Sequence, residues 1–230
     1  MNKMPNLLTA YQIIQPTLEA LINFIYPPYC ILCENHLNTR DHLICSTCWL
    51  NLPLLKNNLG ILPPLSGVWS VWSYDDRLQK IIHEMKFYRK PSLARKIGKA
   101  MASLMIENTI LQSVQYLIPV PLHKIRLRER GYNQSVLLAK VISQQTHIPV
   151  ENNCLKRIRN TRPQSKLNAE ERRTNVVGAF RVSRQVKISG KMVILIDDVF
   201  TTGATLQECA IQLLNIGARQ VFALTAARAD

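Results

Sequence analysis

Residues 193–205 read VILIDDVFTTGAT and decide the fold that we expect for this chain. The first four residues are aliphatic, which is typical of a strand buried on both faces of a parallel sheet. Asp197 and Asp198 follow at the expected end of that strand, and a threonine-rich loop then leads into a helical pattern. Backbone N–H groups at the start of such a helix attract anions, and Gly203 lets a ligand approach the backbone closely. The stretch therefore predicts a parallel α/β domain with an anion site where this strand ends.

The acidic pair would repel a bare phosphate, so neighbouring hydroxyl groups of a sugar, with or without a bound magnesium ion, fit it better. The alternative is a buried strand with a helix-capping turn, where Asp and Thr are common. The stretch closely resembles the phosphoribosyl pyrophosphate (PRPP) motif of type I phosphoribosyltransferases. This resemblance implies that the acidic pair contacts the ribose hydroxyls, that the loop holds the 5-phosphate and that magnesium accompanies PRPP. The implied PRPP-binding residues are Asp197, Asp198, Thr201, Thr202, Gly203, Ala204 and Thr205.

Length and composition favour a folded protein. The chain has 230 residues, of which 47% are hydrophobic, enough to build one packed domain with a small appendage. No apolar run reaches the ~18 residues that span a bilayer, and no secretory signal pattern opens the chain. Apolar residues recur at helical spacing over residues 7–25, which favours a helix packed on the body over a membrane anchor. We expect a cytoplasmic protein, with the inner face of the membrane left open as its place of action.

The positive charge is concentrated in one interval. The formal net charge is +14, and residues 121–191 hold 16 Lys and Arg against four Glu. Such a field attracts phosphate groups, whether on a small substrate or along a nucleic-acid backbone. Charge by itself does not separate these two partners.

Two Cys-x-x-Cys pairs, Cys30 with Cys33 and Cys45 with Cys48, are separated by eleven residues. Each pair can hold one side of a tetrahedral metal ion, and four protein ligands leave no open position for catalysis. We therefore expect a structural zinc ion that stabilises a segment too small to build its own core. Disulfides are disfavoured in the reducing compartment where a PRPP-using protein works. An iron–sulfur cluster is a further alternative for four thiolates, although this spacing favours zinc.

A cluster of prolines at positions 53, 63 and 64, followed by Ser66 and Gly67, marks a linker. We expect an N-terminal helix and four-cysteine zinc-binding subdomain over residues 1–66 and a phosphoribosyltransferase domain over residues 67–230. Hydrophobic patterns within the second domain predict three more strands and three helices. The strands are expected at residues 68–74, 116–121 and 220–225, and the helices after Asp75, over residues 92–105 and over residues 133–143. A further helix is expected to begin at Asn168.

Three arginines alternate in LHKIRLRERGYNQ, residues 122–134. We expect an extended loop here, which would place all three on one side. Three guanidinium groups on one side would hold a pyrophosphate, whereas the alternative is a solvated basic loop. With the preceding strand end, the expected pyrophosphate loop comprises Val120, Pro121, Arg126, Arg128 and Arg130.

Residues 155–167 form a polar, basic stretch with one proline. By resemblance to type I enzymes, this position holds a mobile loop that closes over PRPP and excludes water. An exposed linker without ligand contacts is the alternative. The candidate contacts are Thr161, Arg162, Gln164 and Lys166.

Together with the PRPP motif, the paired cysteines, PVPLH at residues 119–123 and RLRERGYNQ at residues 126–134 resemble the ComF family. The resemblance runs from about Tyr26 to the C-terminus. It implies a phosphoribosyltransferase-like protein that supports DNA uptake in natural transformation. The implied partners are PRPP, single-stranded DNA and other competence proteins, such as a DNA-uptake helicase or channel.

Three functions are compatible with these motifs: a transferase acting on an unidentified base or amine, a PRPP-binding module of the DNA-uptake machinery, and a scaffold with an idle site. The complete PRPP motif argues against the idle scaffold. Only Tyr132 and Phe180 are aromatic within the basic interval, which argues against direct DNA binding by base stacking. A transferase would mainly position its two reactants and neutralise the charge that grows on pyrophosphate. No catalytic residue is assigned, although His123 and Tyr132 are available as general bases.

Overall fold

The computed structural model describes residues 27–37, 43–55, 62–87, 90–161, 168–183 and 188–229. The helix expected over residues 7–25 lies outside them. The chain divides into two compact units between Asn51 and Leu52. Residues 52–55 and 62–66 group with the larger unit, where Leu54 forms a β-bridge with Trp72 and Leu65 is buried in the core. The expected boundary between the two domains at residue 66 stays a prediction.

The smaller unit is built around the four cysteines. A β-bridge joins Tyr29 to His36 after the first Cys-x-x-Cys pair has turned the chain. A short helix, α2 (Ser46–Leu50), begins directly after Cys45. The second pair therefore lies at the start of a helix.

A four-stranded parallel sheet forms the centre of the larger unit, in the order β1-β6-β5-β2. Parallel neighbours require crossover connections, which the helices provide, and their carboxyl ends meet at one edge of the sheet. That edge carries the ends of β1, β2 and β5. The strands are β1 (Gly67–Ser73), β2 (Tyr116–Pro119), β5 (Met192–Phe200) and β6 (Gln220–Arg228).

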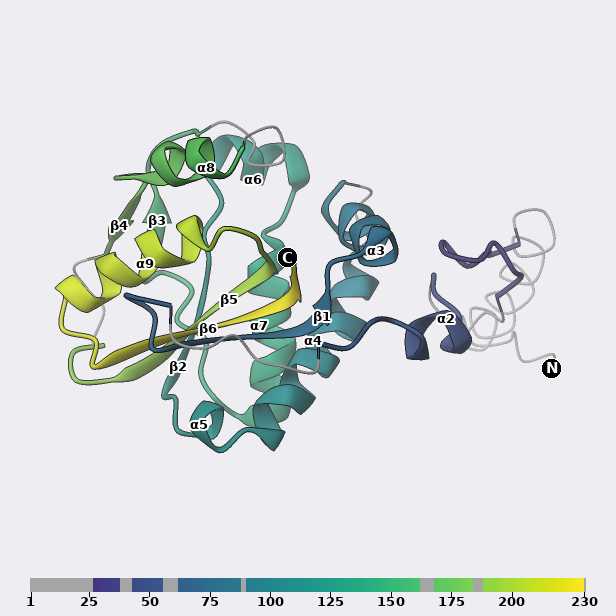
Figure 1. Ribbon diagram of the computed structural model, residues 1–230, viewed down its shortest axis with the longest axis horizontal. Helices are drawn as coiled ribbons and strands as arrows, with labels where there is room; N and C mark the ends of the chain where they lie inside the picture. Colours follow the sequence, from purple (N-terminus) through teal and green to yellow (C-terminus); the bar gives the residue numbers. More distant parts are fainter. Residues whose placement is uncertain are drawn as a thin grey trace, which may run out of the picture. The chain divides into compact units, whose positions relative to one another are not determined.

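Helices cover both faces of this sheet. Helices α4 and α7 pack on each other and on the sheet, while α9 packs on β5 and β6 from the other side (Figure 1). The helices of this unit are α3 (Asp76–Phe87), α4 (Pro91–Glu107), α5 (Thr109–Gln112), α6 (Lys124–Arg130), α7 (Gln134–Thr146), α8 (Ala169–Val176) and α9 (Ala204–Asn215). No described helix combines the length and apolar character needed to cross a bilayer.

The predicted helix starts are confirmed by their caps. Asp75 Oδ1 accepts the N–H of Leu78 at 2.9 Å, and Asn133 Oδ1 accepts the N–H of Ser135 at 3.0 Å. Asn168 caps α8 through a capping box with Glu171. Each cap satisfies backbone donors that a helix N-terminus leaves open.

The strand expected to end before the acidic pair continues further. Asp197 pairs with Thr225 and Phe200 pairs with Arg228, so the pair lies within β5. Strand β5 continues past residue 196 because β6 extends to Arg228 and provides backbone hydrogen-bond partners along that length. The acidic side chains are thus held by a sheet rather than by a loop.

A second, two-stranded antiparallel sheet was not predicted. It pairs β3 (Leu155–Arg157) with β4 (Phe180–Val182), and α8 lies between them in sequence. A β-bridge between His123 and Arg157 connects β3 to the segment that precedes α6. This sheet therefore stands beside the carboxyl end of β2.

The strand that carries the acidic pair is anchored in the core. Residues 193–196 of β5 have no exposed surface, as expected for a strand covered on both faces. Leu206, Cys209 and Leu213 of α9 form one buried cluster with Val193 and Leu195. Burying each such aliphatic side chain stabilises the fold by about 1.5–3 kcal/mol. The expected fold class, a mostly parallel sheet flanked by helices together with a separate four-cysteine unit, is confirmed.

Candidate functional site

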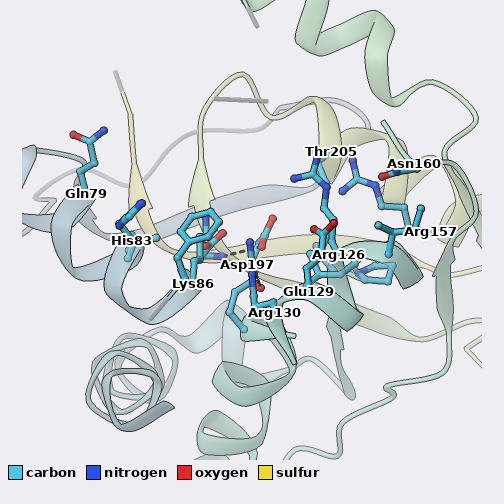
Figure 2. Close-up of a pocket in the computed structure, with 18 of the residues that line it drawn as sticks. Gln79, His83, Lys86, Arg126, Glu129, Arg130, Arg157, Asn160, Asp197 and Thr205 are labelled. Carbon is cyan, nitrogen blue, oxygen red and sulfur yellow. Dashed lines mark hydrogen bonds and ion pairs between the residues drawn. The ribbon is translucent and has the colours of Figure 1, made fainter. Parts of the chain in front are cut away.

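A cleft of about 730 Å³ lies at the carboxyl edge of the parallel sheet (Figure 2). Its walls come from the end of β1, from α3, from the β2–α6 segment, from β3 and from β5. The basic lining side chains outnumber the acidic ones, so the cleft favours an anionic ligand. The charged lining residues are Lys86, Arg126, Glu129, Arg130, Arg157, Asp197 and Asp198.

The acidic pair is held from several directions. Asp197 Oδ1 accepts hydrogen bonds from Ser135 Oγ and from the Asp198 N–H, both at 2.9 Å. Asp198 Oδ1 accepts the Val199 N–H at 3.0 Å, and Oδ2 forms an ion pair with Lys86 Nζ. The two carboxylates therefore have different partners, one a hydroxyl group and the other an ammonium group.

These surroundings change the titration of Asp197. Burial, reinforced by the charge of Asp198, raises the pKa of Asp197 to about 7, although Lys86 and the hydrogen bonds oppose the rise. Near neutral pH, this carboxyl group is therefore divided between its protonated and ionised forms. Asp198 is only 4% exposed and has Lys86 as its counter-ion. The pair can thus accept hydroxyl donors without holding two uncompensated charges.

The loop that follows β5 is sterically restricted. Gly203 has a φ of 75°, and a Cβ placed there would lie 2.9 Å from Phe200 Cε2. Both the backbone angle and the close ring require glycine. Of the predicted PRPP-binding residues, Asp197, Asp198 and Thr205 line the cleft. The other four, Thr201, Thr202, Gly203 and Ala204, lie in or next to the loop at the start of α9.

The extended loop expected around the three arginines was wrong, because residues 124–130 form helix α6. His123 Nδ1 accepts the Ile125 N–H at 3.4 Å, and Gly131 ends the helix in a left-handed conformation with a φ of 83°. Residues four apart share a helix face, so Arg126 and Arg130 both line the cleft. Arg128 is exposed and does not line it.

Three arginines that line the cleft, Arg126, Arg130 and Arg157, are called the basic wall below, and Thr161 accepts hydrogen bonds from two of them. Arg126 Nη2 donates to the Thr161 carbonyl at 3.1 Å, and Arg157 Nη2 donates to Thr161 Oγ1. Arg130 bonds Gln134 Oε1. Within the described part of the chain, none of these arginines forms an ion pair. Their charges remain available to an anionic ligand.

Of the four residues expected in the mobile loop, only Thr161 is described. It is 7% exposed and accepts hydrogen bonds from two arginines that line the cleft. Arg162, Gln164 and Lys166 lie outside the described residues. Val120 and Pro121, predicted at the end of the second strand, both line the cleft.

Sequence reasoning missed Lys86, Ser135 and Arg157 as site residues. Lys86 follows the buried Met85 in the last turn of α3, and Ser135 lies in the first turn of α7. Arg157 lies two residues after buried Leu155 on a strand that was not predicted. No local motif marks these positions, since they approach the acidic pair only through the tertiary fold.

The general-base candidates have structural contacts. His123 is 7% exposed and caps α6, while Tyr132 donates its hydroxyl hydrogen bond to the Met85 carbonyl. Burial raises the pKa of Tyr132, so its hydroxyl group stays protonated at neutral pH. Neither side chain lines the cleft.

The four predicted metal ligands converge in the smaller unit. The Sγ atoms of Cys30, Cys33, Cys45 and Cys48 all lie within 4.8 Å of one another. Cys33 Sγ and Cys45 Sγ are 3.7 Å apart, which fits the separation of about 3.8 Å that zinc–sulfur bonds of ~2.3 Å require in a tetrahedron. Burial raises the pKa of Cys30, but backbone N–H donors outweigh it and lower the value to about 6, which favours a thiolate ligand. A structural zinc ion therefore fits this cluster.

Known families and proteins are similar to this chain both in the cysteine-containing segment and over most of its length. Residues 21–59 match the double zinc ribbon domain. DNA utilization protein YhgH of Escherichia coli O157:H7 is 33% identical over 80% of this chain and 77% of its own length. Competence protein F of Haemophilus influenzae is 29% identical over 87% of this chain and 96% of its own length. Competence protein ComFC of Bacillus subtilis is 28% identical over 76% of this chain and 68% of its own length.

Solved structures similar to this chain include phosphoribosyltransferases. A purine phosphoribosyltransferase from Pyrococcus horikoshii has a TM-score of 0.36 and 15% identity, covering 58% of this chain and 80% of that enzyme. Adenine phosphoribosyl transferase from Trypanosoma brucei has a TM-score of 0.41 and 11% identity, covering 74% of this chain and 87% of that enzyme. The sequence relatives are closer and extend over most of the chain. The chain belongs to the ComF family of competence and DNA-utilization proteins.

Proposed function

We propose that the cleft binds PRPP and that the chain acts as a phosphoribosyltransferase-like protein in DNA uptake during natural transformation. The observation that carries this proposal is that one cleft holds both the acidic pair and three arginines, Arg126, Arg130 and Arg157, that form no ion pair with any described residue. A ligand that joins a hydroxyl-bearing sugar to a pyrophosphate matches both. The names of the relatives, DNA utilization protein and competence protein, support the biological setting. We place this activity in the cytoplasm, at the inner face of the membrane.

The acidic pair suits the sugar. Ionised carboxylates accept hydrogen bonds from hydroxyl donors, and Ser135 and Lys86 keep Asp197 and Asp198 oriented into the cleft. A magnesium ion, which takes oxygen ligands from phosphates and carboxylates, belongs to this part of the proposal.

The phosphates are assigned to two other parts of the cleft. Arg126 and Arg130 of α6 would take the pyrophosphate, because both line the cleft and neither forms an ion pair with a described residue. The loop from Thr201 to Thr205, at the positive end of α9, would take the 5-phosphate. Arg157, anchored by Thr161, adds a further cation beside Arg126.

Pentosyl transfer would break the bond between the sugar C1 and pyrophosphate and form a bond from C1 to a nitrogen of the acceptor. The arginines would stabilise the charge that the departing pyrophosphate gains, and the acidic pair would fix the sugar. Proton removal is assigned to no side chain, since His123 caps a helix and Tyr132 contacts Met85.

A second candidate is a PRPP-regulated DNA-binding or scaffold component without transferase activity. The excess of Lys and Arg over Glu in residues 121–191 favours a nucleic-acid partner. Release of pyrophosphate from PRPP, measured with a panel of bases, amines and single-stranded DNA, separates the two candidates. Release that depends on one acceptor supports the transferase.

The binding proposal is tested by Asp197→Asn combined with Asp198→Asn. Each weakened charge-assisted hydrogen bond costs about 1.5–3 kcal/mol. The two losses together should lower PRPP affinity by a factor between roughly hundreds and tens of thousands. The measurement is isothermal titration with PRPP. Asp76→Asn is the matched control, because this exposed carboxylate at the start of α3 does not line the cleft. An unchanged PRPP titration in the double variant would remove the site assignment.

A further inference from the structure

Helix α3 presents a second stripe besides its buried one. Leu78, Ile81, Ile82 and Met85 are the buried residues of this helix. Gln79, His83 and Phe87 are spaced four residues apart, so they follow one another along another side of the helix. All three line the cleft and are exposed. This set, Gln79, His83 and Phe87, is called the α3 stripe below.

The aromatic end of the stripe is exposed yet held in place. Phe87 is 62% exposed. Its ring centroid lies 4.7 Å from that of His83, with 39° between the planes, and 5.2 Å from the guanidinium carbon of Arg130. A phenyl ring at the surface of a polar cleft gains nothing from burial, but contacts to His83 and Arg130 fix its orientation. Such a ring offers a flat surface against which another ring can lie.

Polar groups also line the cleft along α3 and at the end of β1. The Gln79 amide offers both a donor and an acceptor, and Tyr74 at the end of β1 also lines the cleft. Burial raises the pKa of Tyr74, so its phenol remains a neutral hydroxyl group at physiological pH. The cleft therefore offers hydrogen-bonding groups as well as an aromatic ring to a ligand ring with polar edges.

The stripe leads directly to the acidic pair. Lys86, the residue before Phe87, forms the ion pair with Asp198. Figure 2 shows Gln79, His83 and Lys86 following one another along α3 toward Asp197. A ring on the stripe would thus be a neighbour of a sugar held by the pair.

We propose that the α3 stripe is a binding subsite for a planar nitrogen heterocycle of the nucleobase class. The role of this ring as the acceptor of pentosyl transfer rests on the proposed function. Binding of the ring to the α3 stripe does not depend on it. The ring can come from a free base or from single-stranded DNA, since both present the same flat surface. Binding of single strands combines aromatic stacking with cations, and the fold places Phe87 against Arg130 although they are far apart in sequence.

The test uses the full chain with three probes, adenine, thymine and a twelve-residue oligothymidylate, in equilibrium dialysis. Phe87→Ala should weaken the probe that binds by about five- to 150-fold, the range expected for loss of one base–aromatic stack. Phe87→Trp keeps an aromatic face and should restore binding. Ile106→Ala removes a comparably exposed apolar side chain, 49% exposed, outside the cleft and should change nothing.

The three probes identify the source of the ring. Phe87-dependent binding of adenine or thymine indicates a free base, and Phe87-dependent binding of the oligonucleotide alone indicates a base within a single strand. The subsite is overturned if the wild type binds no probe, if Phe87→Ala binds like wild type, or if Ile106→Ala loses as much. A PRPP titration of the wild type runs in parallel. Absence of PRPP binding beside Phe87-dependent base binding would defeat the proposed function and leave the subsite standing.

Discussion

The four-cysteine cluster and the cleft differ in how the chain assembles them. All four thiols lie between Cys30 and Cys48, and two short turns bring them within 4.8 Å of one another. The charged residues of the cleft come from α3, α6, β3 and β5, so a complete parallel sheet must form before they meet. A site made by local spacing can be predicted in full from sequence, whereas a site made by topology is predicted only where a motif is continuous.

The largest expected effect tests whether the cluster is independent of the cleft. Cys30→Ser combined with Cys45→Ser removes one ligand from each pair, and structural zinc is worth about 10–16 kcal/mol in small zinc peptides. We expect the variant to lose its zinc and the smaller unit to unfold. The parallel sheet should persist, because its core contains none of these four cysteines. Elemental analysis and circular dichroism measure the two outcomes.

The matched control for the cysteine variant is Cys154→Ala. Cys154 is buried in the core of the larger unit, and burial raises its pKa to about 12, so its thiol stays protonated. About one zinc ion per chain should remain. Full zinc retention by the double serine variant would contradict the four-ligand site, and loss of the sheet would contradict the independence of the two regions.

The next effect tests the helical geometry of the basic wall. Arg126→Ala with Arg130→Ala removes two charged donors from the cleft, which should cost about 3–6 kcal/mol, or roughly a hundred- to ten-thousand-fold in PRPP affinity. Ribose 5-phosphate lacks the pyrophosphate and should lose far less. Arg128→Ala is the control variant, because the Arg128 side chain does not line the cleft. Titrations with both sugars measure the difference.

Two outcomes would revise this wall. If Arg128→Ala lost as much PRPP affinity as the double variant, all three arginines would contact the ligand from one side of the segment, as an extended loop would allow. An unchanged PRPP constant beside collapsed oligonucleotide binding would assign the wall to a nucleic-acid backbone. In that case, the salt dependence should become shallower by about 0.7 for each phosphate of a single strand that the variant no longer binds.

The same contrast explains what the sequence could predict. The strand at residues 193–196 and the helix after Asp75 were predicted because their hydrophobic patterns and caps are local. Helix α6 was missed because its alternating arginines imitate the two-residue period of a strand. His123 is an uncommon N-cap, and it concealed the helix start, although Gly131 marked its end.

The missed site residues have a different cause. Lys86 and Arg157 reach the cleft from α3 and β3, which are separated from β5 in sequence. Whether they face Asp198 or solvent depends on strand order and on the unpredicted pairing of β3 with β4. Hydrophobic periodicity determines which side of an element is buried, but it does not determine which other element lies opposite.

A smaller effect tests the rigidity of the loop after β5. In Gly203→Ala, the new side chain must accept a φ of 75° and a contact of 2.9 Å with Phe200 Cε2. A non-glycine residue in this region costs about 1–3 kcal/mol of the free energy of unfolding. Gly190→Ala is matched in backbone angle, with a φ of 71°, but its Cβ would meet nothing within 4 Å. Urea unfolding should show a greater loss for Gly203→Ala, and equal losses would mean that Phe200 moves aside.

The smallest expected effect concerns the pH dependence of PRPP binding and has no counterpart in the cysteine cluster. The pKa of Asp197 is raised to about 7, and the ionised carboxylate is the better acceptor for sugar hydroxyls. Affinity should therefore increase from pH 6 to pH 8 by about tenfold, as the ionised fraction increases. The phosphates of PRPP also titrate in this range, so the wild-type curve alone does not identify Asp197.

Ser135→Ala isolates the contribution of the protein. The hydrogen bond from Ser135 Oγ to Asp197 Oδ1 lowers the pKa of Asp197, so its removal must raise that pKa further. The midpoint of the affinity curve should then move to higher pH, while the titration of the ligand stays the same. Titrations of both proteins at five pH values between 6 and 8.5 measure the shift. A midpoint that stays in place would mean that Asp197 does not control binding, and a midpoint that moves to lower pH would mean that Ser135 favours the protonated carboxyl group.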